Sequence, residues 1–147
     1  MYKRQRLDLV AAEAVERARR DRPRVEFTTD LEETVVFGVR DRLERAIANL
    51  LDNAAKWSPP GGTVDVAVRG GEVTVRDRGP GIADEDLPFV FDRFYRSPSA
   101  RGLPGSGLGL AIVRQVADAH SGTVVAEHAP GGGTLVRLSL NGAASSY

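Results

Sequence analysis

The stretch that decides the fold of this chain reads Asn49-Leu50-Leu51-Asp52-Asn53-Ala54-Ala55-Lys56-Trp57-Ser58. On a helix that turns about 100° per residue, Asn49, Asn53 and Lys56 fall within about 60° of one another. The apolar residues of the same segment centre about 140° away from them. One helix face is therefore expected to pack against the core while the other presents polar groups. The apolar set is Leu43, Ile47, Leu50, Leu51 and Ala54.

The residue types on the polar face point beyond simple solvation. Asn is a mediocre helix former, and a helix that needs only a wet face would use Glu, Lys or Gln instead. Two amides one turn apart, with an ammonium group on the next turn, suit a hydrated cation and a phosphate. An ordinary solvated face remains the alternative at this point.

Composition excludes several classes of protein. A chain of 147 residues is long enough for one domain with its own core, and it has no cysteine for a disulfide, a thiolate zinc site or a thiol nucleophile. Twenty basic and twenty acidic residues cancel, so we predict no nucleic acid partner. No apolar run approaches the about 20 residues that span a bilayer, so we predict no direct membrane insertion. A local arginine cluster is interpreted as a solvated helix end: Arg17, Arg19, Arg20, Arg22 and Arg24.

The first part of the chain offers weaker patterns. Residues 1–6 are polar without periodicity and are interpreted as a linker or a cloning remnant. A short strand is predicted at 7–10 and a helix at 11–20. Two β-branched runs, 25–29 and 35–39, flank an acidic turn and are predicted to form a hairpin.

The central part gives clearer signals. The long helix is predicted to begin at Asp41 or its neighbour and to end at Ser58-Pro59-Pro60-Gly61-Gly62. Strands at 63–68 and 72–77 are joined by the turn Gly70-Gly71, which predicts a hairpin.

The last part repeats the alternation of helix and strand. An aromatic and basic segment at 89–96 leads into a loop at 97–105, whose proline, serine and glycine content is typical of a mobile segment. A helix is predicted at 107–120, followed by strands at 123–127 and 135–140. The tail after Asn141 is expected to fray.

A carboxylate on an apolar strand face is the second candidate feature. Alternation puts Val73, Val75 and Asp77 on one face, where a buried carboxylate must find a donor. Gly79 and Gly81 allow a planar group to approach the main chain closely. An ordinary Asp-x-Gly turn is the alternative interpretation.

The third candidate feature is the glycine cluster Gly105-Ser106-Gly107-Leu108-Gly109-Leu110, which opens a helix. Small residues and free amides at a helix N-terminus favour an anion. The cluster is not a dinucleotide fingerprint, because no strand precedes it and Leu110 occupies the third glycine position; no Gly-Lys-Ser/Thr follows for a Walker A loop. Taken in order along the chain, these features describe a nucleotide cradle, with Gly133-Thr134 adding a hydroxyl.

With these motifs, the chain resembles the catalytic and ATP-binding domain of bacterial sensor histidine kinases, in the superfamily shared with DNA gyrase, a heat-shock chaperone and MutL. The resemblance runs from about Leu7 to Leu140. It comprises the N box at 49–58, the first glycine box at 77–81, the F box at 89–96, the second glycine box at 105–110 and the terminal Gly133-Thr134.

The resemblance implies a role for each matched residue. Asp77 would bind the adenine amino group, with Thr134 nearby through water. Asn53 would ligate Mg²⁺ with support from Asn49, and Lys56 would contact phosphate, so these three form the implied catalytic set. Further implied nucleotide contacts are Gly79, Gly81, Arg93, Gly105, Gly107, Leu108 and Gly109.

Other implied roles concern the segment over the nucleotide. The loop between Arg96 and Gly105 would be the ATP lid, and Arg93 would contact phosphate or steady this lid. Phe91 and Phe94 are interpreted as lid anchors, with core packing as an equal alternative.

The resemblance also implies the fold and the domain bounds. We expect an α/β two-layer sandwich of the Bergerat type, with a mixed, mainly antiparallel sheet of about five strands and helices on one face. The catalytic domain is predicted to cover residues 7–141, with a frayed tail at 142–147.

By resemblance, the function is transfer of the γ-phosphoryl group of Mg-ATP to a histidine on a separate dimerisation domain of the same kinase, which then serves a response regulator. His120 and His128 lack the following acidic residue of a phosphoacceptor and are interpreted as helix-end or strand residues. The isolated domain is expected to be monomeric and cytoplasmic, and the parent kinase dimeric and anchored in the bacterial inner membrane.

Two other functions stay open at the level of sequence. One is an anti-sigma-factor serine kinase, and the other is a non-enzymatic nucleotide-binding switch. Hydrolytic relatives and the anti-sigma kinases place a Glu four residues before the magnesium Asn, where this chain has Asn49, which cannot act as a general base. This difference favours a histidine kinase and predicts negligible ATP hydrolysis.

Overall fold

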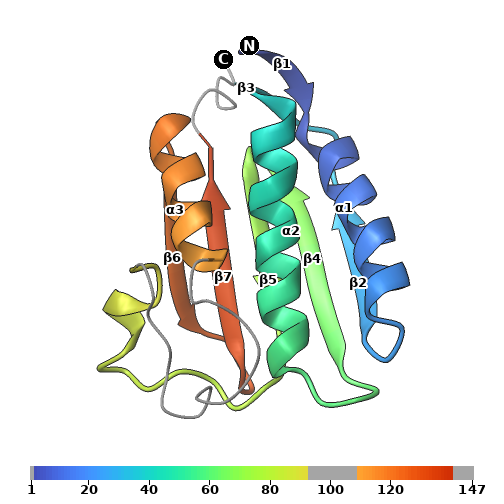
Figure 1. Ribbon diagram of the computed structural model, residues 1–147, viewed down its shortest axis with the longest axis vertical. Helices are drawn as coiled ribbons and strands as arrows, with labels where there is room; N and C mark the ends of the chain where they lie inside the picture. The colour runs from blue at the N-terminus through green and yellow to red at the C-terminus, as the bar shows by residue number, and fades with distance from the viewer. Residues whose placement is uncertain (1, 93–108, 141–147) are drawn as a thin grey trace.

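The computed structural model describes residues 2–92 and 109–140. Three helices, all on one side, cover a five-stranded sheet with the strand order β2-β4-β5-β7-β6, which confirms the predicted two-layer sandwich (Figure 1). The elements are β1 (Lys3–Arg6), α1 (Leu7–Asp21), β2 (Glu26–Leu31), β3 (Val35–Gly38), α2 (Arg40–Trp57), β4 (Thr63–Arg69), β5 (Glu72–Arg76), the 3₁₀ turn η1 (Leu87–Phe89), α3 (Gly109–Ala119), β6 (Thr123–His128) and β7 (Thr134–Ser139).

The sheet is mixed and mainly antiparallel, as predicted. β2 and β4 are parallel, which requires the crossover that α2 provides. The pairs β4–β5, β5–β7 and β6–β7 are antiparallel. The predicted hairpin at 63–77 is confirmed, and the predicted strands at 123–127 and 135–140 form a second antiparallel pair. The loop between β6 and β7 lies beside the Arg76 end of β5, because Arg76 is paired with Leu135.

Helix α2 lies at the centre of the helical layer because its apolar face meets both the sheet and the neighbouring helices. Leu43, Ile47 and Leu51 are fully buried, as the helical spacing predicted. The amide of Leu43 donates to the carbonyl of Val39 at 3.0 Å at the start of the helix. At the other end the hydroxyl of Ser58 donates to the carbonyl of Ala54 at 3.0 Å, and Pro59 disfavours a further helical turn.

The beginning of the chain differs from the prediction. The predicted strand at 7–10 is wrong, because α1 already begins at Leu7. Leu7, Val10, Ala11, Ala14 and Val15 are all buried, so the apolar spacing of the helix extends back through the segment that was read as a strand. Residues 3–6, for which no element was predicted, form β1 and pair with β3. The domain bounds 7–141 stay a prediction.

The predicted hairpin between 25–29 and 35–39 is also wrong. β2 pairs with β4, and β3 pairs with β1 in a separate two-stranded sheet. Asp8 explains part of this arrangement, because its carboxylate accepts from Arg6 Nε at 2.9 Å and from the amide of Thr34 at 3.2 Å. This contact, together with the amide of Leu7 donating to Thr34 at 2.8 Å, directs the chain after β2 toward β1.

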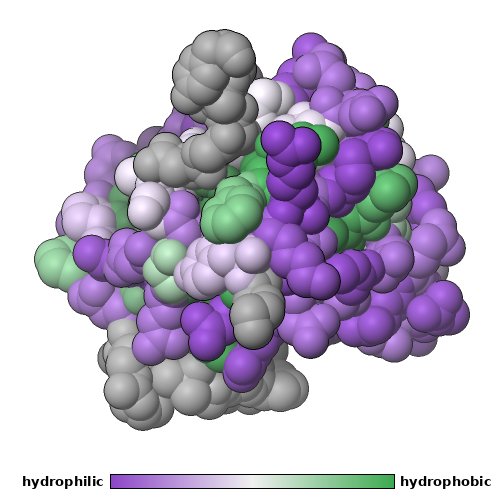
Figure 2. Space-filling view, turned by 90° about the horizontal axis from the view of Figure 1, so that it is seen from above, coloured by the Kyte–Doolittle hydropathy of each residue, from purple (hydrophilic) through white to green (hydrophobic). Residues whose placement is uncertain are grey.

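The β1–β3 pair lies at the end of the molecule that Figure 2 views, where mostly polar surface is interrupted by apolar areas. Tyr2 and Phe37 stack there with their ring centroids 6.0 Å apart. Among the helices within 2–92 and 109–140, none combines the length and the apolar character needed to cross a bilayer.

Candidate nucleotide-binding site

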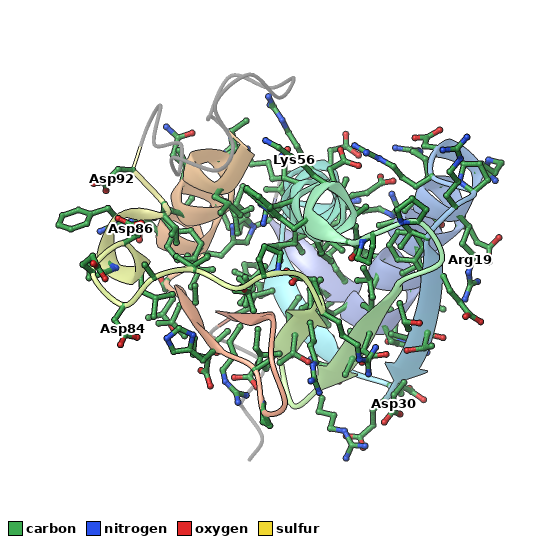
Figure 3. All side chains as sticks on the ribbon, turned by 90° about the horizontal axis from the view of Figure 1, so that it is seen from below. Arg19, Asp30, Lys56, Asp84, Asp86 and Asp92 are labelled. Carbon is green, nitrogen blue, oxygen red and sulfur yellow. The ribbon has the colours of Figure 1, made fainter. Side chains whose placement is uncertain are left out.

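The polar face of α2 presents the predicted side chains Asn49, Asn53 and Lys56, each partly exposed. The Asn49 amide nitrogen donates to the carbonyl of Arg45 at 3.0 Å, which fixes the direction of its oxygen. Asn53 forms no side-chain hydrogen bond to any other residue in the described ranges, so its amide is available to a ligand. The Lys56 ammonium lies 6.0 Å from the centroid of the Trp57 ring. Figure 3 shows Lys56 at the end of the molecule where α2 finishes.

The first residue of α3 lies directly beside Asn49. A Cβ atom added at Gly109 would come within 3.3 Å of Asn49 Oδ1, which is tighter than ordinary contact. The N-terminus of α3, with its free backbone amides, therefore faces the polar stripe of α2. This arrangement joins the amide-bearing helix and the anion-favouring helix start into one site.

Asp77 is the buried acceptor of the site, with a relative exposure of 5%. One carboxylate oxygen, Oδ1, accepts from the amide of Gly79 at 2.9 Å and from the amide of Thr134 at 3.4 Å. Within the described residues no donor reaches the second oxygen, Oδ2. Burial raises the pKa of Asp77, while the two amides and the charge of Arg76 lower it.

Two close backbone contacts hold Asp77 in place. A Cβ at Gly79 would lie 2.5 Å from the carbonyl oxygen of Trp57, and a Cβ at Gly133 would lie 2.0 Å from the carbonyl oxygen of Asp77. Neither position can carry a larger residue without a shift of the main chain. The end of α2 and the β6–β7 loop therefore both close on the Asp77 strand end.

Thr134 and Gly81 complete the part of the site that the structure describes. Thr134 is buried at 5% exposure, and its carbonyl accepts from the amide of Asp77 at 3.0 Å. Gly81 has a φ of 85°, a backbone conformation that L-residues rarely adopt. Asp77, Gly79, Gly81 and Thr134 thus lie together, as the motifs predicted.

Several predicted residues lie outside the described residues. These are Arg93, Phe94, Gly105, Gly107 and Leu108, together with the predicted lid at 97–105 and the tail at 142–147. Their roles stay predictions. Phe91 is described, and it is buried at 7% exposure in the core, which favours the packing alternative over a lid anchor.

Both histidines hold structural positions. His120 directly follows α3, and its ring is buried. Its Nε2 accepts from the amide of Val39 at 3.1 Å and its Nδ1 lies 2.8 Å from the carbonyl of Val116. His128 ends β6, and its Nε2 contacts Asp84. The interpretation of both as helix-end and strand residues is confirmed.

The side chains in the described ranges could hold a metal ion only together with a bound ligand that supplies further oxygen atoms. Within 2–92 and 109–140 no group of three or more His, Cys, Asp or Glu residues could hold an ion. Mg²⁺ commonly takes one or two protein oxygens and completes its shell with water and substrate phosphates. The uncommitted amide of Asn53 beside Asn49 meets that limited requirement.

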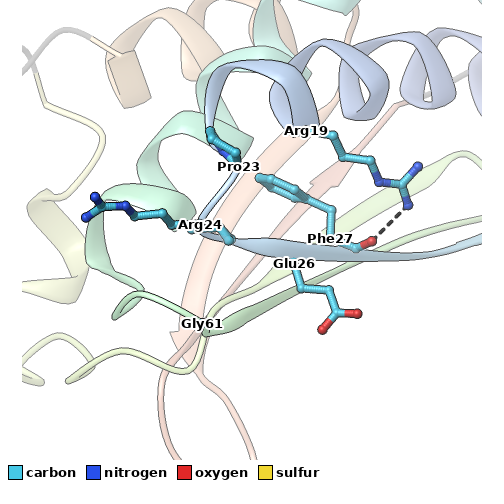
Figure 4. Close-up of a pocket in the computed structure, with 7 residues that line it drawn as sticks. Arg19, Pro23, Arg24, Glu26, Phe27 and Gly61 are labelled. Atoms are coloured by element: carbon cyan, nitrogen blue, oxygen red, sulfur yellow. Dashed lines mark hydrogen bonds between the residues drawn. The ribbon is translucent and has the colours of Figure 1, made fainter.

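A separate open hollow lies near the start of β2, as Figure 4 shows. There Arg19 donates to the carbonyl of Phe27 at 2.9 Å. The hollow shares no residue with the predicted nucleotide site, so it has no part in the arrangement around Asp77. Its lining residues are Arg19, Pro23, Arg24, Val25, Glu26, Phe27 and Gly61.

Comparisons with known proteins agree with this geometry. Residues 38–143 match the family of histidine kinase-, DNA gyrase B- and HSP90-like ATPases. The chain is 50% identical over 138 residues to the signal transduction histidine-protein kinase/phosphatase MprB of Mycolicibacterium smegmatis, covering 88% of this chain and 28% of that protein.

Solved structures give the same result. A mycobacterial sensor histidine kinase MprB structure superposes with a TM-score of 0.88 at 42% identity, covering 94% of this chain and 97% of that one. The ATP-binding domain of PrrB from Mycobacterium tuberculosis superposes with a TM-score of 0.76 at 25% identity, covering 96% and 97%.

The chain therefore belongs to the histidine kinase-, DNA gyrase B- and HSP90-like ATPase family, and it is an ATP-binding catalytic domain of the sensor histidine kinase type. It spans 28% of the length of the curated M. smegmatis relative. The resemblance drawn from the five sequence motifs is confirmed.

One residue of the site region escaped the sequence analysis. Arg76 Nη2 donates to the carbonyl oxygens of Pro130 and Gly132, more than fifty residues along the chain. A local pattern cannot reveal such a contact, because the partners are main-chain carbonyls of a glycine-rich loop. The only signal was the position of Arg76, directly before Asp77.

Proposed function

We propose that the chain binds ATP between α2, α3 and the strand ends of β5 and β7, and that it donates the γ-phosphoryl group to a histidine of a separate helical domain. The observation that carries this proposal is Asp77. Its Oδ1 is held by two amides, and its Oδ2 is left for an outside donor. An exocyclic amino group of adenine is such a donor, and a buried acceptor would otherwise remain without its partner.

The residues of α2 and α3 would act by positioning and charge neutralisation, which is the chief task in phosphoryl transfer. Asn53 would hold Mg²⁺ with Asn49 beside it, Lys56 would contact phosphate, and the amides at the start of α3 would face the phosphate oxygens. Magnesium, when bound, neutralises charge on the phosphates. Arg93, Gly105, Gly107 and Leu108 are proposed to complete the phosphate contacts.

The wider assembly follows from the same proposal. The parent protein would be a dimer anchored in the inner membrane, with this domain on the cytoplasmic side and a response regulator receiving the phosphoryl group downstream. The relatives named above are histidine kinases, which favours this function over an anti-sigma serine kinase or a non-enzymatic switch.

The test is incubation of the chain with γ-labelled ATP, Mg²⁺ and the histidine-bearing helical domain of the parent protein, supplied separately. Acid-labile, base-stable label on that domain is expected. Acid-stable phosphoserine on a partner would point to the serine kinase instead. ATP binding without transfer to any partner would point to the switch.

A further inference from the structure

The β6–β7 loop, residues 129–133, has few internal contacts that stabilise its conformation. Gly131, Gly132 and Gly133 follow one another with φ values of 83°, 112° and 90°. Glycine occupies such conformations without strain, but it also leaves them easily, because it has more backbone freedom than any other residue. The internal bonds of the loop are few: the amide of Ala129 donates to Gly133, and that of Gly132 donates to Ala129, both at 3.0 Å.

Arg76 supplies an anchor from outside the loop. Its Nη2 donates to the carbonyl of Pro130 and to that of Gly132 at 3.3 Å. Its Nε is buried and has no acceptor among the described residues. A surface arginine selected only for solvation would not bear this desolvation cost.

The strand register excludes the simplest alternative for Arg76. Asp65 lies directly across the β4–β5 ladder from Arg76, where a cross-strand ion pair would be expected. The Asp65 carboxylate instead bonds to Arg78 at 2.7 Å and to Thr28 at 2.6 Å. Arg76 therefore donates to the carbonyls of Pro130 and Gly132 instead of to the carboxylate of Asp65.

The loop in turn determines the surroundings of Asp77. Gly133 lies against the Asp77 carbonyl so closely that a Cβ would come within 2.0 Å of it. The next residue, Thr134, donates its amide to Asp77 Oδ1 at 3.4 Å, near the limit of a hydrogen bond. A displacement of the loop by a few tenths of an ångström would remove this bond and leave the Gly79 amide, at 2.9 Å, as the one remaining donor to the carboxylate among the described residues, so the carboxylate would be less firmly oriented.

We propose that Arg76 is a positioning residue for adenine selectivity: by holding the carbonyls of Pro130 and Gly132 it fixes the Thr134 amide on Asp77, and so aims the free carboxylate oxygen at the amino group of the base. This inference rests on the proposed nucleotide function. Arg76 acts from the sheet face opposite to the helices, through the loop, and contacts no nucleotide.

The test uses Arg76→Met, Arg76→Lys and a matched control, Arg137→Met. Arg137 lies on the same sheet face, and among the described residues its side chain donates to Glu127 at 2.9 Å and to Glu72 at 3.1 Å and not to the loop. Lysine retains the charge near Asp77, but its ammonium does not reproduce the planar guanidinium, whose Nη2 donates to both loop carbonyls. Thermal melts establish that each variant is folded.

The first measurement is amide hydrogen exchange in the nucleotide-free protein. Exchange at Thr134 is expected to be at least about tenfold faster in both Arg76 variants and within about twofold of wild type in Arg137→Met. Unchanged exchange in Arg76→Met would overturn the inference without reference to any nucleotide. Wild-type exchange in Arg76→Lys would show that a positive charge at this position suffices, and would overturn the role of the guanidinium Nη2.

The second measurement is calorimetric affinity for ATP and for inosine triphosphate, which has a carbonyl in place of the amino group. The preference for ATP is expected to fall about tenfold, or about 1.4 kcal/mol, in both Arg76 variants and to persist in the control. Faster exchange with an unchanged preference would leave Arg76 a merely structural role and overturn the proposal. A wild-type protein with no preference for ATP would contradict the function of Asp77 itself.

Discussion

Asn49 and Asn53 look equivalent in the sequence, yet their side chains have different environments. Asn49 is tied to the carbonyl of Arg45 and has its oxygen beside Gly109. Asn53 has no such partner among the described residues. The spacing of the two amides predicted the face of α2 on which they lie. It could not predict that Asn49 is held by a hydrogen bond and that Asn53 is not, because this depends on the neighbours of each side chain in the fold.

Replacement of Asn53 by Ala should weaken Mg-dependent ATP binding at least about tenfold, or about 1.4 kcal/mol, because the metal loses its protein oxygen. Titration calorimetry with Mg²⁺ and with a chelator measures this effect. In chelator, wild type and Asn53→Ala should bind ATP equally. Asp52→Ala, a neighbouring and mostly exposed position, is the control and should bind like wild type. Equal affinity of Asn53→Ala and wild type in Mg²⁺ would remove the metal role.

Replacement of Asp77 by Asn should reduce ATP affinity at least about tenfold and abolish selection of adenine. The side-chain oxygen of Asn can keep the bonds to Gly79 and Thr134, and its NH₂ group then occupies the place of Oδ2. This NH₂ group would face the amino group of adenine, so a donor would oppose a donor. Competition between ATP and inosine triphosphate measures the selection. A variant that still prefers ATP would refute the assignment of Asp77.

The same substitution should stabilise the empty protein at pH 7. Burial raises the pKa of Asp77, so the native state favours the protonated form; the associated stability is present below the usual pKa of Asp and is lost as pH rises through the raised value. Asn removes this cost, and the melting temperature at pH 7 should rise by roughly 2–4 °C, as for about 1 kcal/mol in a domain of this size. The difference should vanish near pH 3. Asp30→Asn, at an exposed position, should change neither value.

At the scale of elements, local sequence patterns predicted the positions of helices and strands better than they predicted which strands pair. The β4–β5 hairpin was predicted from the glycine turn between its alternating strands, because the partner is the next strand along the chain. The strands β6 and β7 were predicted, and the structure adds their antiparallel pairing. The β2–β3 hairpin was wrong, since β2 finds β4 only through the long crossover of α2. β1 was missed because Lys3–Arg6 has no apolar alternation, and its pairing with β3 depends on a contact made by Asp8.

The contact of Asp8 with Arg6 and Thr34 should make the stability of the protein depend on acid. The hydrogen bond from Arg6 is the main cause that lowers the pKa of Asp8 to about 2. A lowered pKa means that the stabilisation is complete above the ordinary pKa of Asp, near 4, and is lost as pH falls through about 2.

Asp8→Asn should therefore lower the free energy of unfolding by about 1–2 kcal/mol at pH 7 and by much less at pH 2. The expected loss at pH 7 is kept this small because Arg6 is partly exposed and solvent weakens the ion pair. Urea denaturation at both pH values measures the difference. The control is Asp30→Asn, whose ion pair with Arg69 is exposed on both sides and should contribute within about 0.5 kcal/mol. An equal loss at pH 7 and pH 2 would contradict the ionic origin of the effect.

For the whole molecule, the order of motifs along the chain was predictable, and their meeting point required the fold. Antiparallel pairing brings the end of β5 beside the start of β7, so Asp77 and Thr134 meet although 57 positions separate them. α2 and α3 pack side by side and bring Asn49 against Gly109. The nucleotide site is thus assembled from four elements at one end of the sandwich, none of which could form it alone.

A ligand that joins four elements should stabilise the molecule as one unit. At a concentration of 100 times its Kd, Mg-ATP should add about 2.7 kcal/mol, which raises the melting temperature of a domain of this size by roughly 5–10 °C in a single transition. Scanning calorimetry measures the shift, and the ATP should be recovered unhydrolysed because Asn49 cannot act as a general base. At the same concentration of Mg-ATP, Asp77→Asn should lose at least about half of the shift, because its affinity is at least about tenfold weaker, and Asp30→Asn should keep it. Two separate transitions, or steady release of phosphate, would show that the site does not unite the elements in this way or that water replaces the histidine as acceptor.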